Sequence, residues 1–296
     1  MIRPFLSVLL LFGCGVAARA GDDPWQVATW NGERALVSTA QGWKAVVSLD
    51  RGRLMYFGVA NREVNLLLAP PSRANRDVLG GHRLWLGPQA TWAKFWPPPA
   101  AWEYSDPESY TIAGGALRLI MPDAGDGWPR LTRTYCWDGP RLVCGAEISG
   151  GTRAAQIIQI FQVPTHTLVT VQAQPEKDFP AGYVELPSTA GPFAARFPQP
   201  QQVTRRTDNL VLRHNGEVVK LGFRPQPLLG TADDFILHVR RATPAGPAAG
   251  EPDEGFYSQV YLSNGGQGFI ELEQLSPLFA AGSAGAFATV LEARPR

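Results

Sequence analysis

The sequence predicts an all-β protein built from antiparallel sheets, and three observations support this fold class. From Trp25 onward, short segments of alternating apolar and polar residues recur, with turn residues about every 8 to 12 positions. The 296 residues include 31 Gly and 26 Pro, which disfavour long helices. No amphipathic helical segment exceeds about ten residues. Because 45% of the residues are hydrophobic, the chain can bury a large core, and we expect a β-sandwich.

The alternating segments define the expected strands. Alternation places successive side chains on opposite faces of a sheet, so each strand is expected to turn an apolar face to the core. The clearest strands are expected at residues 34–39, 44–49, 53–59, 116–121, 142–148, 156–163, 203–213, 217–223, 235–241, 256–262, 268–275 and 286–293. No repeat of fixed period is present, which argues against a propeller or a solenoid.

Two segments interrupt this pattern. Residues 69–110 are rich in Pro, Trp and Gly, and three consecutive prolines at 97–99 predict a stiff, extended stretch. A long connection of this kind is often functional, although it can also be a plain linker. Residues 242–254 contain three prolines and are expected to form a surface connection.

The N-terminus has the pattern of a secretory signal peptide. Arg3 precedes an apolar run, and Ala18 and Ala20 fit the small residues before a cleavage site. We therefore expect residues 1–20 to be removed and residues 21–296 to form one domain in the periplasm or outside the cell. The alternative is a lipoprotein anchored at Cys14, which the bulky Phe12 disfavours. No later apolar stretch is long enough to span a membrane as a helix.

Two further cysteines, Cys136 and Cys144, flank an Asp-Gly-Pro turn. A hairpin about this turn would place them nearly opposite each other, and an oxidising compartment would allow a disulfide between them. The alternative is two buried thiols. Their spacing, without a nearby histidine cluster, does not predict a zinc site.

The interrupting segment contains a concentration of aromatic and hydrogen-bonding residues. Four of the nine tryptophans lie between residues 85 and 102, and His82, Arg83 and Gln89 lie beside them. Indole faces suit the C–H face of a sugar ring, and the polar side chains suit its hydroxyls. Arg83 could also bind the carboxylate or phosphate of an anionic sugar. The alternative is a hydrophobic cluster that fixes the segment to the sandwich.

Near the C-terminus, residues 269–275 (FIELEQL) alternate so that Glu271 and Glu273 share one face of a strand. Paired carboxylates can act as general acid and base, although they are more often the solvated side of a sheet. His166 follows an apolar strand at a position where a catalytic histidine could lie, although an isolated histidine is more often structural.

Several classes of function are excluded. The 27 basic and 26 acidic residues nearly balance, and no basic stripe is present to bind the phosphates of nucleic acid. The sequence lacks an HExxH helix, a phosphate-binding loop and a GxSxG elbow, which excludes the corresponding metalloproteases, nucleotide hydrolases and α/β-hydrolases. We expect no metal, no cofactor and a monomer.

Residues 80–85 (GGHRLW), Pro88-Gln89, Trp96 with prolines 97–99, and residues 269–277 resemble an uncharacterised bacterial family of galactose-mutarotase-like, or aldose 1-epimerase-like, fold. The resemblance covers most of the mature chain. It implies a β-supersandwich of antiparallel sheets whose concave face binds carbohydrate. The segment around His166 is similar to the one that carries the catalytic histidine of mutarotases, with Leu168 and Val169 in place of an aromatic residue and Asn. The segment around Glu271 is similar to the strand that carries their general base.

The resemblance implies a mechanism without a cofactor. Glu271 would remove the proton of the anomeric hydroxyl while His166 protonates the ring oxygen. The sugar would be positioned by His82, Arg83, Trp85, Gln89, Trp96 and Glu273. The alternatives are a non-catalytic glycan-binding or accessory envelope protein and, less favoured, a polysaccharide lyase or hydrolase that uses Glu271 and Glu273. All of these functions require the tryptophan-rich segment and the strand of Glu271 to face the same side of the molecule.

Overall fold

The computed structural model describes residues 24–70, 79–94, 97–177, 179–186 and 201–296. Within these residues the chain forms 22 strands, one four-residue α-helix and two short 3-10 helices. Neighbouring strands in its sheets run antiparallel. The predicted all-β antiparallel fold is confirmed.

Two sheets form the body of the protein, and the smaller of them has six strands. In spatial order these are β12 (Val184–Leu186), β15 (Val219–Phe223), β19 (Ser258–Leu262), β20 (Ile270–Leu275), β10 (Gln156–Val163) and β5 (His82–Gly87). The larger has ten strands: β13 (Val203–Arg205), β14 (Leu210–Leu212), β11 (Leu168–Val171), β16 (Leu228–Ala232), β17 (Phe235–Arg241), β22 (Gly285–Pro295), β9 (Arg141–Ser149), β8 (Arg130–Asp138), β7 (Ala116–Ile120) and β6 (Ser109–Ala113).

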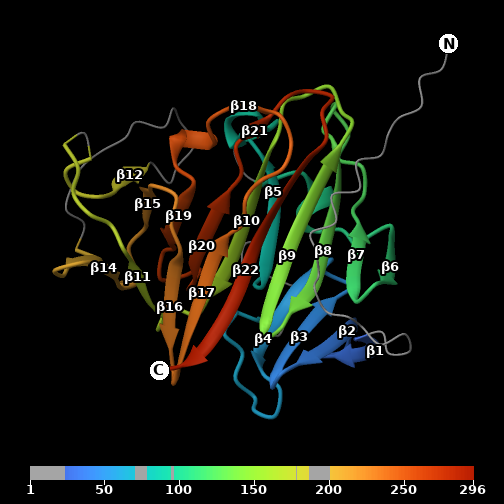
Figure 1. The fold of residues 1–296 in the computed structure, drawn as a ribbon, viewed down its shortest axis with the longest axis horizontal. Coiled ribbons are helices and arrows are strands. Elements are labelled where there is room, and N and C mark those ends of the chain that lie inside the picture. Colours follow the sequence, from blue (N-terminus) through green and yellow to red (C-terminus); the bar gives the residue numbers. More distant parts are fainter. Residues whose placement is uncertain (1–23, 71–78, 95–96, 178, 187–200) are drawn as a thin grey trace.

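Smaller elements complete the structure. A four-stranded sheet consists of β1 (Trp25–Trp30), β2 (Glu33–Ala40), β3 (Trp43–Ser48) and β4 (Arg53–Val59), and it lies at the lower end of the view in Figure 1. Strands β18 (Ala248–Gly250) and β21 (Leu278–Phe279) pair with each other. The helices are η1 (Gln89–Thr91), α1 (Ala100–Glu103) and η2 (Asp253–Gly255).

The two large sheets pack against each other through one face of each (Figure 1). From the six-stranded sheet, the Gln159 amide donates to the Phe287 carbonyl of β22 at 3.0 Å. Leu272 and Phe161, on the same face, are fully buried. We call this the inner face of the six-stranded sheet, and the opposite one its outer face. Burying the apolar side chains between the sheets supplies most of the favourable free energy of folding.

The segment at residues 69–110 differs from the expected irregular loop, because it contains β5. Both faces of this strand are buried, so it lacks the alternation that marks a half-exposed strand. Gly80 and Gly81 lead into it with φ of 73° and 69°. A Cβ would lie 2.3 Å from the Leu68 carbonyl oxygen at Gly80, and 2.2 Å from that of Leu54 at Gly81. These glycines therefore allow β5 to enter the sheet beside other backbone segments.

Two other expectations require correction. Residues 203–213 form the two strands β13 and β14 rather than one, because the polar residues between them make a hairpin turn. Cys136 and Cys144 do not form a disulfide with each other, since Cys144 is a free, buried thiol. In the β8–β9 hairpin Cys144 lies opposite Tyr135, whereas Cys136 lies opposite Val143. This offset of one residue places the two side chains on opposite faces of the sheet.

Candidate functional site

The outer face of the six-stranded sheet brings together residues that are far apart in the sequence. In the register of the sheet Gln162 of β10 lies opposite Glu271 of β20, and Arg83 of β5 and Glu273 of β20 both lie opposite Ile160. Side chains opposite each other in antiparallel strands share a face, so these polar residues lie on one surface. The predicted convergence of the tryptophan-rich segment and the late strand is confirmed.

Glu271 accepts two hydrogen bonds, one from the adjacent strand β10 and one from β5 on the far side of β10. Arg83 Nη1 and Gln162 Nε2 donate to its Oε1 atom at 2.9 and 3.0 Å. The oxygen of the Gln162 amide accepts a hydrogen bond from the Gly80 backbone at 2.8 Å, which fixes the amide orientation. The Glu271 side chain is 7% exposed, so Glu271 and Glu273 are not the solvated side of a sheet.

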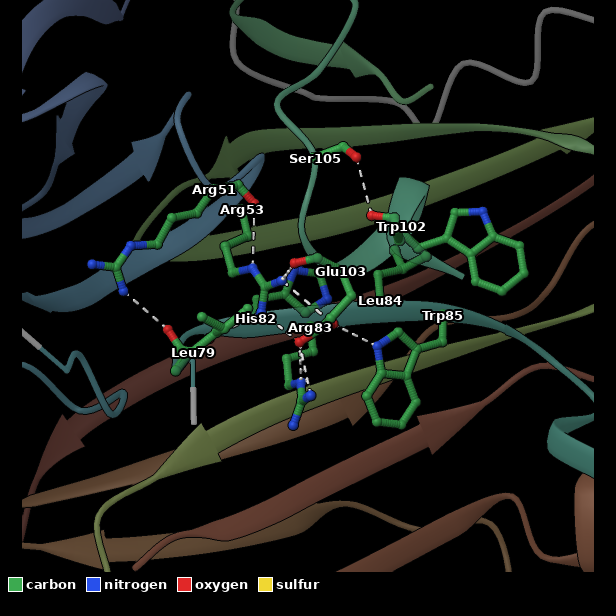
Figure 2. A network of polar contacts seen from close by, with 12 residues as sticks. Arg51, Arg53, Leu79, His82, Arg83, Leu84, Trp85, Trp102, Glu103 and Ser105 are labelled. Carbon is green, nitrogen blue, oxygen red and sulfur yellow. Dashed lines mark hydrogen bonds and ion pairs between the residues drawn. The ribbon is translucent and has the colours of Figure 1, made fainter. Parts of the chain in front are cut away.

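A second carboxylate, Glu103 of α1, completes this cluster and has no signal in the sequence beyond its place in the tryptophan-rich segment. Figure 2 shows Glu103 between Arg53 and Arg83, with the Trp85 indole directed towards it. Its carboxylate lies 2.7 Å from Arg83 Nη2 and 3.3 Å from Arg53 Nη2, and it accepts a 2.7 Å hydrogen bond from Trp85 Nε1. The site therefore spans β4, β5, β10, β20 and α1.

The two carboxylates that pair with Arg83, those of Glu271 and Glu103, differ in acidity. Burial raises the pKa of Glu271 to about 7; Arg83 opposes this shift and Glu273 adds to it. Burial would also raise the pKa of Glu103, but Arg53 and Arg83 outweigh it and the pKa is lowered. Glu103 is therefore a permanent anion at neutral pH. Glu271 can exchange a proton, as a general acid or base requires.

Further along the same row lie Tyr261 of β19, opposite Glu271, and Lys220 of β15, opposite Tyr261. Lys220 Nζ lies 3.4 Å from Glu273 Oε2. Burial and the Glu271 charge raise the pKa of Tyr261 to about 12, so its hydroxyl keeps its proton at neutral pH. Sequence alternation could have placed these residues on one face of their strands, but the order of strands in the sheet was needed to place them beside Glu271.

The tryptophans pack on one another. Trp85 and Trp92 meet edge to face with ring centroids 5.5 Å apart, and Trp102 and Trp128 meet in the same way at 5.0 Å. All four are buried. This is the hydrophobic cluster that fixes the segment to the sandwich. Trp85 contributes its N–H to Glu103 rather than an open ring face for a sugar. Trp96, also predicted as a sugar contact, lies outside the described residues.

The side chain of His82 points to the opposite face of the sheet from that of its neighbour Arg83. Its ring is on the inner face, stacked on Phe161 with centroids 4.4 Å apart, and it is fully buried. Burial, together with the charges of Arg133 and Arg53, lowers its pKa well below the usual value. This position separates the His82 ring from the surface on which Arg83 lies, so the structure does not support the predicted sugar contact.

His166 and Gln89 have their described contacts with aspartates rather than with Glu271. The His166 side chain is 60% exposed after β10, with Nε2 3.9 Å from Asp233 in the β16–β17 turn of the ten-stranded sheet. The backbone N–H of Gln89 in η1 donates to Asp253 at 2.6 Å. Their predicted roles gain no support from these contacts. The described residues contain no group of three or more His, Cys, Asp or Glu arranged to hold a metal, and none of their helices is long and apolar enough to cross a membrane.

Solved structures share this architecture. A galactose mutarotase-like protein from Lactobacillus casei matches with a TM-score of 0.58 and 10% identity, over 88% of this chain and 100% of that one. A galactose mutarotase related enzyme from Lactobacillus acidophilus matches at 0.57 and 9%, over 88% and 97%. A candidate aldose 1-epimerase from Escherichia coli K12 matches at 0.60 and 11%, over 92% and 100%.

The chain has a galactose-mutarotase-like fold. The predicted resemblance to such proteins is confirmed at the level of structure. No protein-family model and no curated protein matches the sequence. At these identities the likeness establishes the fold, and the chemistry has to be argued from the site itself.

Proposed function

We propose that the protein binds a sugar on the outer face of the six-stranded sheet and interconverts its anomers, with Glu271 as the group that moves the proton. The observation that supports this most is the Glu271 carboxylate, nearly buried, hydrogen-bonded by Arg83 and Gln162, and with a pKa of about 7. A base with a pKa near the working pH suits removal of the anomeric proton. The fold, shared with mutarotase-like proteins, agrees with this chemistry.

Ring opening also needs a proton donor for the ring oxygen. His166 and His82 have their contacts elsewhere, whereas Tyr261 lies opposite Glu271 and is protonated at neutral pH. We assign the donor role to Tyr261, with the ammonium of Lys220 next to it in the row. Protein groups alone would carry out the reaction.

The charge of the site favours a neutral sugar. Arg83, which the sequence suggested as a partner for a uronate or sugar phosphate, is paired with both Glu103 and Glu271. Its positive charge is balanced within the protein, so an anionic ligand would gain little from it. The proposal includes export of the protein, which the signal-peptide pattern of residues 1–20 supports.

Polarimetry tests the catalytic proposal. Freshly dissolved α-glucose or α-galactose should reach its anomeric equilibrium faster with the protein than in buffer. Glu271→Gln should lose at least about a hundredfold in rate, because general base catalysis contributes roughly that much. Glu147→Gln, a charge-matched change on the ten-stranded sheet, should leave the rate unchanged. No acceleration by the wild-type protein across a panel of aldoses would refute the epimerase.

A non-catalytic glycan-binding protein is the second candidate, favoured by the contacts of both predicted histidines away from Glu271. It predicts sugar binding, seen by calorimetry or a glycan array, that survives Glu271→Gln and is weakened by Lys220→Met. Binding without any change in mutarotation rate would select this function. The absence of binding to any glycan would exclude it.

A further inference from the structure

The side chain of Glu103 is fully buried, and its own short helix does not account for this burial. Helix α1 has four residues, and the Glu103 side chain at its end has no solvent exposure. A buried carboxylate strongly destabilises a fold unless charged partners compensate it. Its partners are Arg53 of β4 and Arg83 of β5, so the strands hold the residue rather than the helix.

The way Glu103 contacts Arg83 determines where Arg83 points. Oε1 of Glu103 accepts from Arg83 Nε at 2.9 Å and lies 2.7 Å from Nη2. The remaining nitrogen, Nη1, donates to Glu271 Oε1 at 2.9 Å. Because the guanidinium is planar and rigid, fixing Nε and Nη2 also fixes the direction of Nη1. Figure 2 shows the Glu103 side of this arrangement, with the Trp85 N–H holding the other carboxylate oxygen.

We propose that Glu103 is a positioning residue for Glu271, acting through Arg83 by fixing the guanidinium and balancing its charge. This rests on the proposed function, in which Glu271 moves the proton. Without the Glu103 charge, Glu271 would face an unbalanced Arg83, with the Arg53 charge close by. Opposite charge favours the ionised carboxylate, so Glu271 would lose its proton at lower pH. The other polar groups that face Glu271 from the surrounding strands stay the same: Gln162 of β10, Tyr261 of β19, Lys220 of β15 and Glu273 of β20.

The test is the titration of Glu271 in Glu103→Gln, which removes the charge and keeps the shape. Infrared difference spectra, taken between each protein and its own Glu271→Gln variant, isolate the carboxyl signal of Glu271. The pH midpoint of that signal should be lower by about one unit in Glu103→Gln than in the wild-type protein. The rising limb of the mutarotation pH profile should move with it, and kcat should fall as Arg83 loses its alignment. Glu147→Gln serves as the charge-matched control and should move neither.

The infrared midpoint separates this inference from the proposed function, because it needs no turnover. A wild-type protein without mutarotase activity would refute the function and still allow the Glu271 titration to be compared. An unchanged midpoint in folded Glu103→Gln would overturn the positioning role. If that variant does not fold, Glu103→Asp keeps the charge but withdraws it by one methylene. It should lower kcat and shift the midpoint less, and a midpoint and kcat equal to wild type would overturn the role.

Discussion

The two faces of the six-stranded sheet differ in the charge state of their buried polar groups, and two adjacent residues of β5 show this difference. His82 and Arg83 are both at most 1% exposed. On the inner face, burial and two nearby arginines lower the pKa of His82 and keep the ring neutral. On the outer face, burial opposes the charge of Arg83, but Glu103 and Glu271 outweigh it and raise its pKa. Counter-charge, rather than burial alone, decides which groups stay ionised.

The inner face contributes mainly to stability, whereas the outer face carries the groups that can exchange protons. The inner face joins the sheets through apolar contacts, such as those of Phe161 and Leu272, which require no ionised partner. The outer face concentrates charges that balance one another, and this balance leaves Glu271 able to exchange a proton near neutral pH. A buried ion pair is an inefficient way to stabilise a fold, which agrees with the role proposed for this cluster.

The largest expected effect is the loss of Arg83. Arg83→Met keeps most of the side-chain volume but leaves Glu271 without an ionic partner and Glu103 with Arg53 alone. We expect a loss of about 3 to 5 kcal/mol in the free energy of unfolding, the usual cost of breaking a buried pair from one side. Urea denaturation followed by tryptophan fluorescence measures this change.

The matched control is Arg118→Met. Arg118 and Glu147 form an ion pair on the ten-stranded sheet with their side chains 39% and 35% exposed. Exposed pairs contribute about 0 to 1 kcal/mol, so the control should lie in that range. If Arg83→Met and Arg118→Met lose the same free energy of unfolding, the outer-face ion pairs contribute no more to stability than an exposed pair does.

Much of the fold follows from local sequence pattern. Residues 156–163 and 235–241 were predicted as strands with the boundaries they have, because regular runs of strand-forming residues end at clear turn signals. The outward direction of Glu271 followed from alternation in β20. The common location of Glu271 and Arg83 was predicted from the resemblance and from the requirements of the chemistry, and their 2.9 Å contact confirms it.

The rest depended on information that no local pattern contains. Strand β5 was missed because its sequence, HRLWLG, neither alternates between polar and apolar residues nor forms a long apolar run, and it lies in a segment rich in Pro, Trp and Gly. Glu103 was missed because its partner Arg53 is 50 residues away and belongs to a different sheet. The predicted disulfide was wrong because the register of the hairpin, which the turn sets, offsets the two cysteines by one residue.

A smaller effect concerns the pH dependence of stability, which Glu271→Gln should reduce. The pKa of Glu271 is about 7 in the folded protein and about 4.3 in an unfolded chain. Between these values the folded state holds a proton that the unfolded state has lost, so this contribution is full at acidic pH and is lost as pH rises through 7. The variant should therefore gain stability relative to wild type from pH 4.5 to 7, by up to about 1.4 kcal/mol per pH unit.

Urea midpoints of the two proteins measured across this range test the sign. Glu103, whose pKa is lowered, contributes in the opposite direction, with stability lost as pH falls, but it is present in both proteins and cancels in the difference. A difference between wild type and variant that stays constant from pH 4.5 to 8 would contradict a raised pKa at Glu271.

The smallest expected effect lies on the inner face, where His82 should remain neutral. Its ring carbon-bound proton signals in NMR spectra, assigned by their loss in His82→Gln, should keep their shifts from pH 8 to pH 5. The reason is that protonation would place a buried charge beside Arg133 and Arg53. Stability gained from a neutral His82 is present above pH 6.5 and would be lost only as pH falls towards its lowered pKa. A titration midpoint near 6.5 would place the ring in contact with water, and the two faces of β5 would then no longer differ in the way their contacts indicate.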